Sequence, residues 1–285
     1  MSTAQILALG AVAGLTIFIG LPIGRLPNAD PRIRAALCSL ATGVLVFLLW
    51  DVLVHGVEPV EESLLEAVDG GSWGRFTGLA VLLGGGLVAG MTSLTYYGRW
   101  MSRRRRSPLV GPGAAAVDEF EERAHSRLAT FSPAARLALL IATGIGLHNF
   151  GEGLAIGQSS AAGELSLAVA LIVGFGLHNA TEGFGIVGPL AADGEVPSWR
   201  FLALLGLIGG GPTFLGTLLG QAWVNDALSV AFFAVAAGSI LYVVLELAHV
   251  NRRFNAPVLT TWMLLLGLFL GYATDFVVEA AEHLS

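Results

Sequence analysis

The sequence predicts an all-α polytopic membrane protein with eight transmembrane helices and with both termini outside the cytoplasm. Three observations predict this class: few charges, long apolar stretches and a one-sided distribution of arginine. Of the 285 residues, 54% are hydrophobic and 13% are charged, against about 25% charged residues in an average soluble protein. So few charges cannot cover the surface of a water-soluble fold of this size, and we expect most of the chain to lie in lipid.

Eight apolar stretches are long enough to cross a hydrocarbon core about 30 Å thick, which takes about 20 helical residues. They lie at residues 3–24, 33–57, 76–98, 134–157, 166–190, 199–223, 226–250 and 258–281. Because backbone polar groups cannot stay unpaired in lipid, and because the stretches lack the alternation of barrel strands, each is predicted to be an α-helix. We interpret residues 1–285 as a single transmembrane domain.

The ends of these stretches also carry information. No basic segment precedes the first one and no small-residue cleavage site follows it, so we expect a retained helix and not a signal peptide. Every basic residue is an arginine, and 14 of the 15 fall on one side of the predicted helices, while Arg75 alone falls on the other. The positive-inside rule assigns the arginine-rich side to the cytoplasm. Residues 100–132 are then a flexible cytoplasmic loop.

Composition also limits the partners. The net charge of −6 argues against a nucleic-acid partner, because such binding depends on positive charge. Cys38 is the single cysteine, so the sequence offers neither a disulfide framework nor a thiolate metal cluster. The lipid bilayer is the partner that the composition indicates.

The most informative feature is a polar motif that occurs twice inside the apolar stretches. Residues 144–153 read GIGLHNFGEG and residues 174–183 read GFGLHNATEG, with seven of ten positions identical. Each copy places a histidine and a glutamate at i and i+4, on one face of a helix, with an asparagine on the adjacent face. The candidate metal-binding residues are therefore His148, Asn149, Glu152, His178, Asn179 and Glu182.

The two copies are predicted to meet halfway across the membrane. His148 and His178 lie roughly 14 and 18 Å below the outer ends of their helices, at about 1.5 Å per residue. Ionisable groups at this depth are costly, about 2.5–3.5 kcal/mol each, and a cation would compensate them. Two imidazoles and two carboxylates suit zinc, iron or manganese better than calcium or magnesium, which prefer oxygen alone. The alternative is a structural clamp, in which the same side chains hydrogen-bond the two helices together.

The HNxxEG motif, followed by a similar motif in the next of eight helices, resembles the ZIP (Zrt/Irt-like protein) family of divalent metal-ion transporters, in the form of a prokaryotic-type member. The resemblance implies a 3+2+3 arrangement of helices with an inverted repeat, in the plasma membrane. It also implies transport of zinc, or of iron, manganese or cadmium, toward the cytoplasm, without enzymatic activity or a prosthetic group. Many members of the family are homodimers.

In the family, the histidines and glutamates of both motifs bind the transported metal, and the first asparagine helps to form a second metal position. The resemblance assigns the first role to His148, Glu152, His178 and Glu182, and the second to Asn149. This chain departs from the usual pattern at Asn179, where many members have an acidic residue. It departs again at Gly211, where a glutamate often precedes the proline of helix 6. We therefore expect one strong metal position and a weakened or absent neighbour.

Other polar residues are candidates for a pathway. Asp51 and His55 lie at i and i+4 near the outer end of the second helix, where they could receive ions or merely reach headgroup water. Glu246, near the inner end of the seventh helix, is a candidate exit ligand. Two other functions stay open: an intramembrane zinc-dependent hydrolase, in which one glutamate serves as general base, and a metal-gated channel or sensor.

Overall fold

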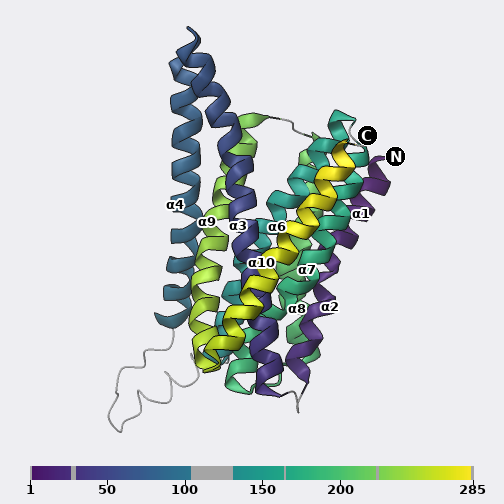
Figure 1. The fold of residues 1–285 in the computed structure, drawn as a ribbon, viewed down its shortest axis with the longest axis vertical. Coiled ribbons are helices and arrows are strands. Elements are labelled where there is room, and N and C mark those ends of the chain that lie inside the picture. The colour runs from purple at the N-terminus through teal and green to yellow at the C-terminus, as the bar shows by residue number, and fades with distance from the viewer. Residues whose placement is uncertain (1, 27–29, 104–130, 164, 223–224, 284–285) are drawn as a thin grey trace, which may run out of the picture.

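The computed structural model describes the chain apart from residues 1, 27–29, 104–130, 164, 223–224 and 284–285 (Figure 1). The elements are α1 (Thr3–Leu15), α2 (Ile17–Gly20), the 3-10 helix η1 (Leu21–Arg25), α3 (Pro31–Val68), α4 (Trp73–Arg103), α6 (Pro133–Ala162), α7 (Leu165–Asp193), α8 (Trp199–Ala222), α9 (Asp226–Arg253) and α10 (Pro257–His283). All regular structure in the described residues is helical, and eight helical spans in them are long and apolar enough to cross a membrane. The predicted fold class is confirmed to that extent.

The first span is not one continuous helix. It consists of α1, α2 and η1 in succession. At the first junction the hydroxyl of Thr16 donates a hydrogen bond to the carbonyl oxygen of Ala13, at 2.7 Å. The chain then tightens into a 3-10 turn at Pro22, which has no backbone N–H to donate. These local hydrogen bonds leave the hydropathy of the segment unchanged, so the sequence pattern did not indicate the break.

Helices α3 and α4 are longer than predicted and project beyond the other helices (Figure 1). α3 continues to Val68, past the expected end at residue 57. In this extension Val60, Ser63 and Ala67 are buried on one face while the intervening glutamates are exposed, which is the pattern of an amphipathic helix. α4 continues to Arg103, into the segment expected to be a loop, and residues 104–130 of that expected loop lie outside the described residues.

The two helices with the repeated motif, α6 and α7, are held close to their neighbours by glycine. An added Cβ at Gly153 would lie 2.1 Å from the carbonyl oxygen of Thr213 on α8, and one at the matching Gly183 would lie 2.6 Å from that of Ile17 on α2. Only glycine allows helix backbones to approach so closely. The last residue of each motif copy therefore lets its helix lie directly against a neighbouring helix, one residue after the glutamate of that copy.

A large apolar cluster lies between α3, α6, α7 and α9, and it extends from the level of the motifs toward the arginine-rich helix ends. Its fully buried members include Leu45, Ile145, Ile186, Ile240 and Leu247. The start of α1 and the end of α10 lie together at the opposite end of the bundle (Figure 1). The motifs thus stand between a densely packed half and the half where the chain begins and ends.

Candidate metal centre

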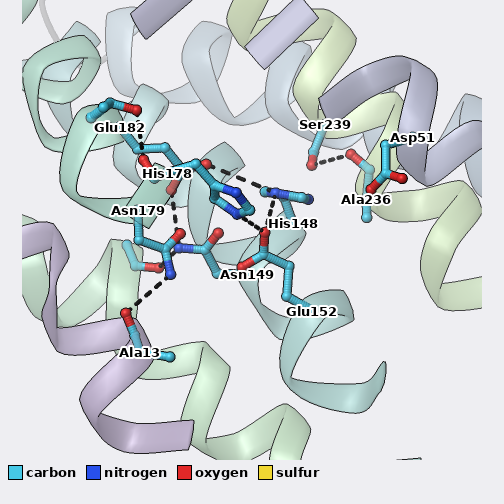
Figure 2. Close-up of polar contacts among 12 residues, drawn as sticks. Ala13, Asp51, His148, Asn149, Glu152, His178, Asn179, Glu182, Ala236 and Ser239 are labelled. Carbon is cyan, nitrogen blue, oxygen red and sulfur yellow. Dashed lines mark hydrogen bonds and ion pairs between the residues drawn. The ribbon is translucent and has the colours of Figure 1, made fainter. Parts of the chain in front are cut away.

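The side chains of both motif copies turn toward one another between α6 and α7 (Figure 2). His148 and Glu152 come from α6, and His178 and Glu182 come from α7. All four are buried, with exposed fractions of 0% for His148 and Glu182, 4% for Glu152 and 6% for His178. The i, i+4 spacing predicted from the sequence thus brings four ionisable groups together in a place that is nearly free of solvent.

The carboxylate of Glu152 lies at the middle of this cluster. Its Oε1 is 3.0 Å from Nε2 of His148 and 2.5 Å from Nε2 of His178. These three residues offer one ligand atom each, and the three atoms lie within 4.8 Å of one another. Zinc with ligands at about 2.1 Å sets neighbouring ligand atoms about 3.4 Å apart in a tetrahedron. The cluster is therefore of a size that a divalent ion can enter with movements of less than about 1 Å.

Glu182 stands slightly farther away than the other three. Its Oε1 lies 3.8 Å from Nε2 of His148, and its Oε2 accepts a hydrogen bond from the side-chain amide of Asn149, at 3.3 Å. The structure therefore brings all four predicted histidines and glutamates together, with three in immediate contact and Glu182 beside them.

Several buried oxygen atoms around the cluster have no hydrogen-bond partner within the described residues. They are Oε2 of Glu152, Oε1 of Glu182, Oδ1 of Asn149 and Oδ1 of Asn179. A buried acceptor without a partner costs about 1–3 kcal/mol, and more when it is charged. The carboxylate oxygens among them, together with the two imidazoles, are a donor set that a divalent cation would satisfy.

The two asparagines, which occupy equivalent motif positions, make different contacts. The amide of Asn149 donates to Glu182 and also to the carbonyl oxygen of Gly209 on α8, at 3.0 Å. The amide of Asn179 donates to the carbonyl oxygen of Ala13 on α1, at 3.2 Å (Figure 2). The repeat is therefore symmetric in its histidines and glutamates but not in its asparagines.

Sequence reasoning missed one contact that positions the site. Ser239 on α9 donates to the carbonyl oxygen of Gly144, at 3.0 Å, one turn before His148 on α6. It also lies 2.7 Å from the carbonyl oxygen of Ala236 in its own helix (Figure 2). The sequence does show a serine within an apolar helix, which indicates that its hydroxyl needs a hydrogen-bond partner. The partner on α6 could not be predicted, because it depends on how two segments that are distant in sequence pack together.

A cavity of about 440 Å³ connects the cluster with the predicted access residues. His148, Glu152 and His178 line it together with Asp51 and His55. Nδ1 of His55 lies 2.9 Å from the carbonyl oxygen of Asp51. That carbonyl can only accept, so Nδ1 donates this hydrogen bond, and Nε2 is the nitrogen that a neutral imidazole would offer to an ion. Among the lining residues of α3, α6 and α10 are further polar side chains: Glu58, Ser159, Thr274 and Asp275.

The remaining predicted pathway residue, Glu246, lies elsewhere. It lines a second cavity, of about 310 Å³, between α4, α6 and α9. Tyr242 lines the same cavity, which also contains the buried Arg136, and Arg136 donates to the carbonyl oxygens of Phe131 and Met101. The structure does not bring Glu246 to the cluster of histidines and glutamates.

Comparison with known proteins agrees with this geometry. The model of the ZIP zinc transporter family matches residues 111–275, which is more than half of the chain and includes both motif copies. No curated protein matches the chain. Members of the matched family transport divalent metal ions, and the buried cluster of histidine and glutamate fits that activity. The chain belongs to the ZIP zinc transporter family.

Proposed function

We propose that the protein carries divalent transition-metal ions, zinc foremost, across the plasma membrane toward the cytoplasm. His148, Glu152, His178 and Glu182 hold the ion midway. The observation that carries this proposal is the buried cluster itself: two imidazole nitrogens lie within 3.0 Å of one carboxylate oxygen, and further carboxylate oxygens beside them have no hydrogen-bond partner within the described residues. Nitrogen and oxygen ligands together favour zinc, with iron, manganese and cadmium as related substrates.

The arginine distribution supports the proposed direction. With the arginine-rich ends in the cytoplasm, the cavity that contains Asp51 and His55 faces outward, and the apolar cluster around Ile145 and Leu247 lies on the cytoplasmic side of the ion. Ions would then collect in the cavity, where the Asp51 carboxylate and Nε2 of His55 offer a first pair of ligands. A role for Glu246 in ion release stays a prediction, because it lies in a separate cavity with Arg136.

Ion binding and proton binding compete in this cluster. Each imidazole nitrogen must be neutral, and each carboxylate ionised, to serve as a ligand. Nε2 of His178 and Oε1 of Glu152 face one another at 2.5 Å, so a proton and an arriving ion compete for the same two atoms. Alternate exposure of the loaded cluster to the two sides of the membrane completes transport.

Metal uptake by reconstituted vesicles tests the proposal. Variants His178→Ala and Glu182→Ala should abolish uptake of zinc, because each removes one ligand from the cluster. His249→Ala is the matched control, since this exposed histidine bonds only within its own helix, to the carbonyl oxygen of Leu245 among the described residues. Uptake at the unmodified rate by the His178 variant would refute the proposal. Ion conductance too fast for an alternating cycle would favour a channel instead.

A further inference from the structure

The amide of Asn149 is held between two oxygen atoms that can only accept hydrogen bonds. Its Nδ2 lies 3.3 Å from Oε2 of Glu182 and 3.0 Å from the carbonyl oxygen of Gly209, and the residue is fully buried. If the amide were turned over, its own oxygen would face both acceptors, with no proton between them. The two neighbours therefore fix the amide with its N–H groups toward Glu182 and α8.

This contact decides which oxygen of Glu182 faces the cluster. Because Oε2 is occupied by Asn149, Oε1 is left toward His148, at 3.8 Å from Nε2, and makes no hydrogen bond within the described residues. The second N–H of Asn149 ties the same amide to α8, so the carboxylate is held relative to a third helix and not only to α6. A carboxylate held by one oxygen presents the other as a single ligand in a defined direction.

The asparagine of the other motif copy does not do this. Asn179 donates to the carbonyl oxygen of Ala13 on α1, so Oε1 of Glu152 meets only the two imidazoles in the described structure. The two carboxylates of the repeat therefore have different neighbours: two histidines contact Glu152, and an asparagine amide donates a hydrogen bond to Glu182.

We propose that Asn149 is a positioning residue, which acts on the transported ion through Glu182 by holding this carboxylate in a one-oxygen binding geometry. The inference rests on the proposed function of the cluster. It differs from the role that the family resemblance implies for Asn149, in which the asparagine itself binds a second ion. The two roles predict different coupling between Asn149 and Glu182, which makes them separable by experiment.

A double-mutant cycle in purified protein provides the test, with zinc affinity measured by competition against a fluorescent chelator. Asn149→Leu removes the amide but keeps the number and branching of the side-chain heavy atoms, and it should weaken zinc binding by about 10- to 100-fold, the usual cost of losing a partner of a metal ligand. In protein that already carries Glu182→Ala there is no carboxylate to position. There, Asn149→Leu should change the affinity by no more than about twofold.

Asn251→Leu is the matched control. Asn251 is also a buried asparagine, but it bonds to Ser39 and Thr42 between α9 and α3, away from the cluster. Its replacement should lower the melting temperature without changing zinc affinity, and so reports the effect of losing a buried amide as such. A similar loss of zinc affinity in this control would overturn the inference.

The outcomes are distinguishable. Additive losses for Asn149→Leu and Glu182→Ala would show that Asn149 contributes as an independent ligand, and would overturn the inference alone. Zinc binding that is unchanged by Asn149→Leu would do the same. Zinc binding that is unchanged by His178→Ala would overturn the proposed function, and the inference with it.

Discussion

Replacement of Gly153 by alanine should disturb the cluster of histidines and glutamates, although Gly153 is not one of the proposed metal-binding residues. The new Cβ would lie 2.1 Å from the carbonyl oxygen of Thr213, 2.8 Å from its carbonyl carbon and 2.9 Å from the backbone nitrogen of Thr217. All three atoms belong to the backbone of α8, so no side-chain rotation can relieve the contact. Since carbon and oxygen need about 3.2 Å, α6 and α8 must separate by about 1 Å at this level.

Two magnitudes follow from that displacement. Overpacking of this kind costs about 1–3 kcal/mol of stability. Glu152 precedes Gly153 directly, and its Oε1 is the atom that both imidazoles contact. A displacement of about 1 Å at a preorganised site can cost about 100-fold in rate. We therefore expect Gly153→Ala to unfold at a lower temperature and to lose most of its zinc uptake.

The assay compares melting temperature in detergent with zinc uptake in vesicles. The matched control is Gly84→Ala on α4, where an added Cβ meets nothing within 4 Å. That variant should keep both properties, since its methyl group enters open space. If Gly153→Ala melts and transports like the Gly84 variant, then close approach at the motif glycine does not set the position of the cluster, and the reasoning fails.

Three further expectations concern ions and protons. Lowering the pH should weaken zinc binding, because protons and the ion compete for the same imidazole and carboxylate atoms; a chelator titration at several pH values measures it. Asp51→Asn should raise the KM for zinc more than it lowers the maximal rate, since Asp51 lines the cavity without belonging to the three-residue cluster; initial uptake rates separate the two. Zinc at 100 times its Kd should stabilise the protein by about 2.7 kcal/mol, seen as a higher melting temperature that Glu152→Gln abolishes.

The parts of the fold that could be predicted from the sequence are those that follow from the requirements of a membrane-spanning segment. A helix must satisfy its own backbone hydrogen bonds in the membrane, so long apolar stretches sufficed to indicate eight spans. The meeting of His148 with His178 also followed, because helical spacing places histidine and glutamate on one face and antiparallel neighbours bring two such faces to one depth. Their ring centroids lie 6.4 Å apart.

The parts that could not be predicted depend on neighbours that are distant in sequence. The different roles of Asn149 and Asn179 arise because Gly209 lies beside the first and Ala13 beside the second. Identical motif letters contain no information about these partners. Likewise, the continuation of α3 places Glu58 in a helix at the cavity, where hydropathy indicated a loop, because an amphipathic turn is too polar to register as a membrane span.

The choice between an ion site and a structural clamp depends on how many of the buried polar atoms in the cluster have a hydrogen-bond partner. A clamp that only joins α6 to α7 gains from each hydrogen bond it makes and loses from each buried group it leaves unpaired. Here Oε1 of Glu152 forms a hydrogen bond with His178 alone, while Nε2 of His148, Oε2 of Glu152 and Oε1 of Glu182 have no hydrogen-bond partner in the described structure. Replacing such a set by apolar side chains would stabilise the metal-free protein. The cluster therefore makes physical sense as a site for a positive ion, and apolar replacement of both histidines and both glutamates together should raise the melting temperature in chelator while abolishing zinc binding.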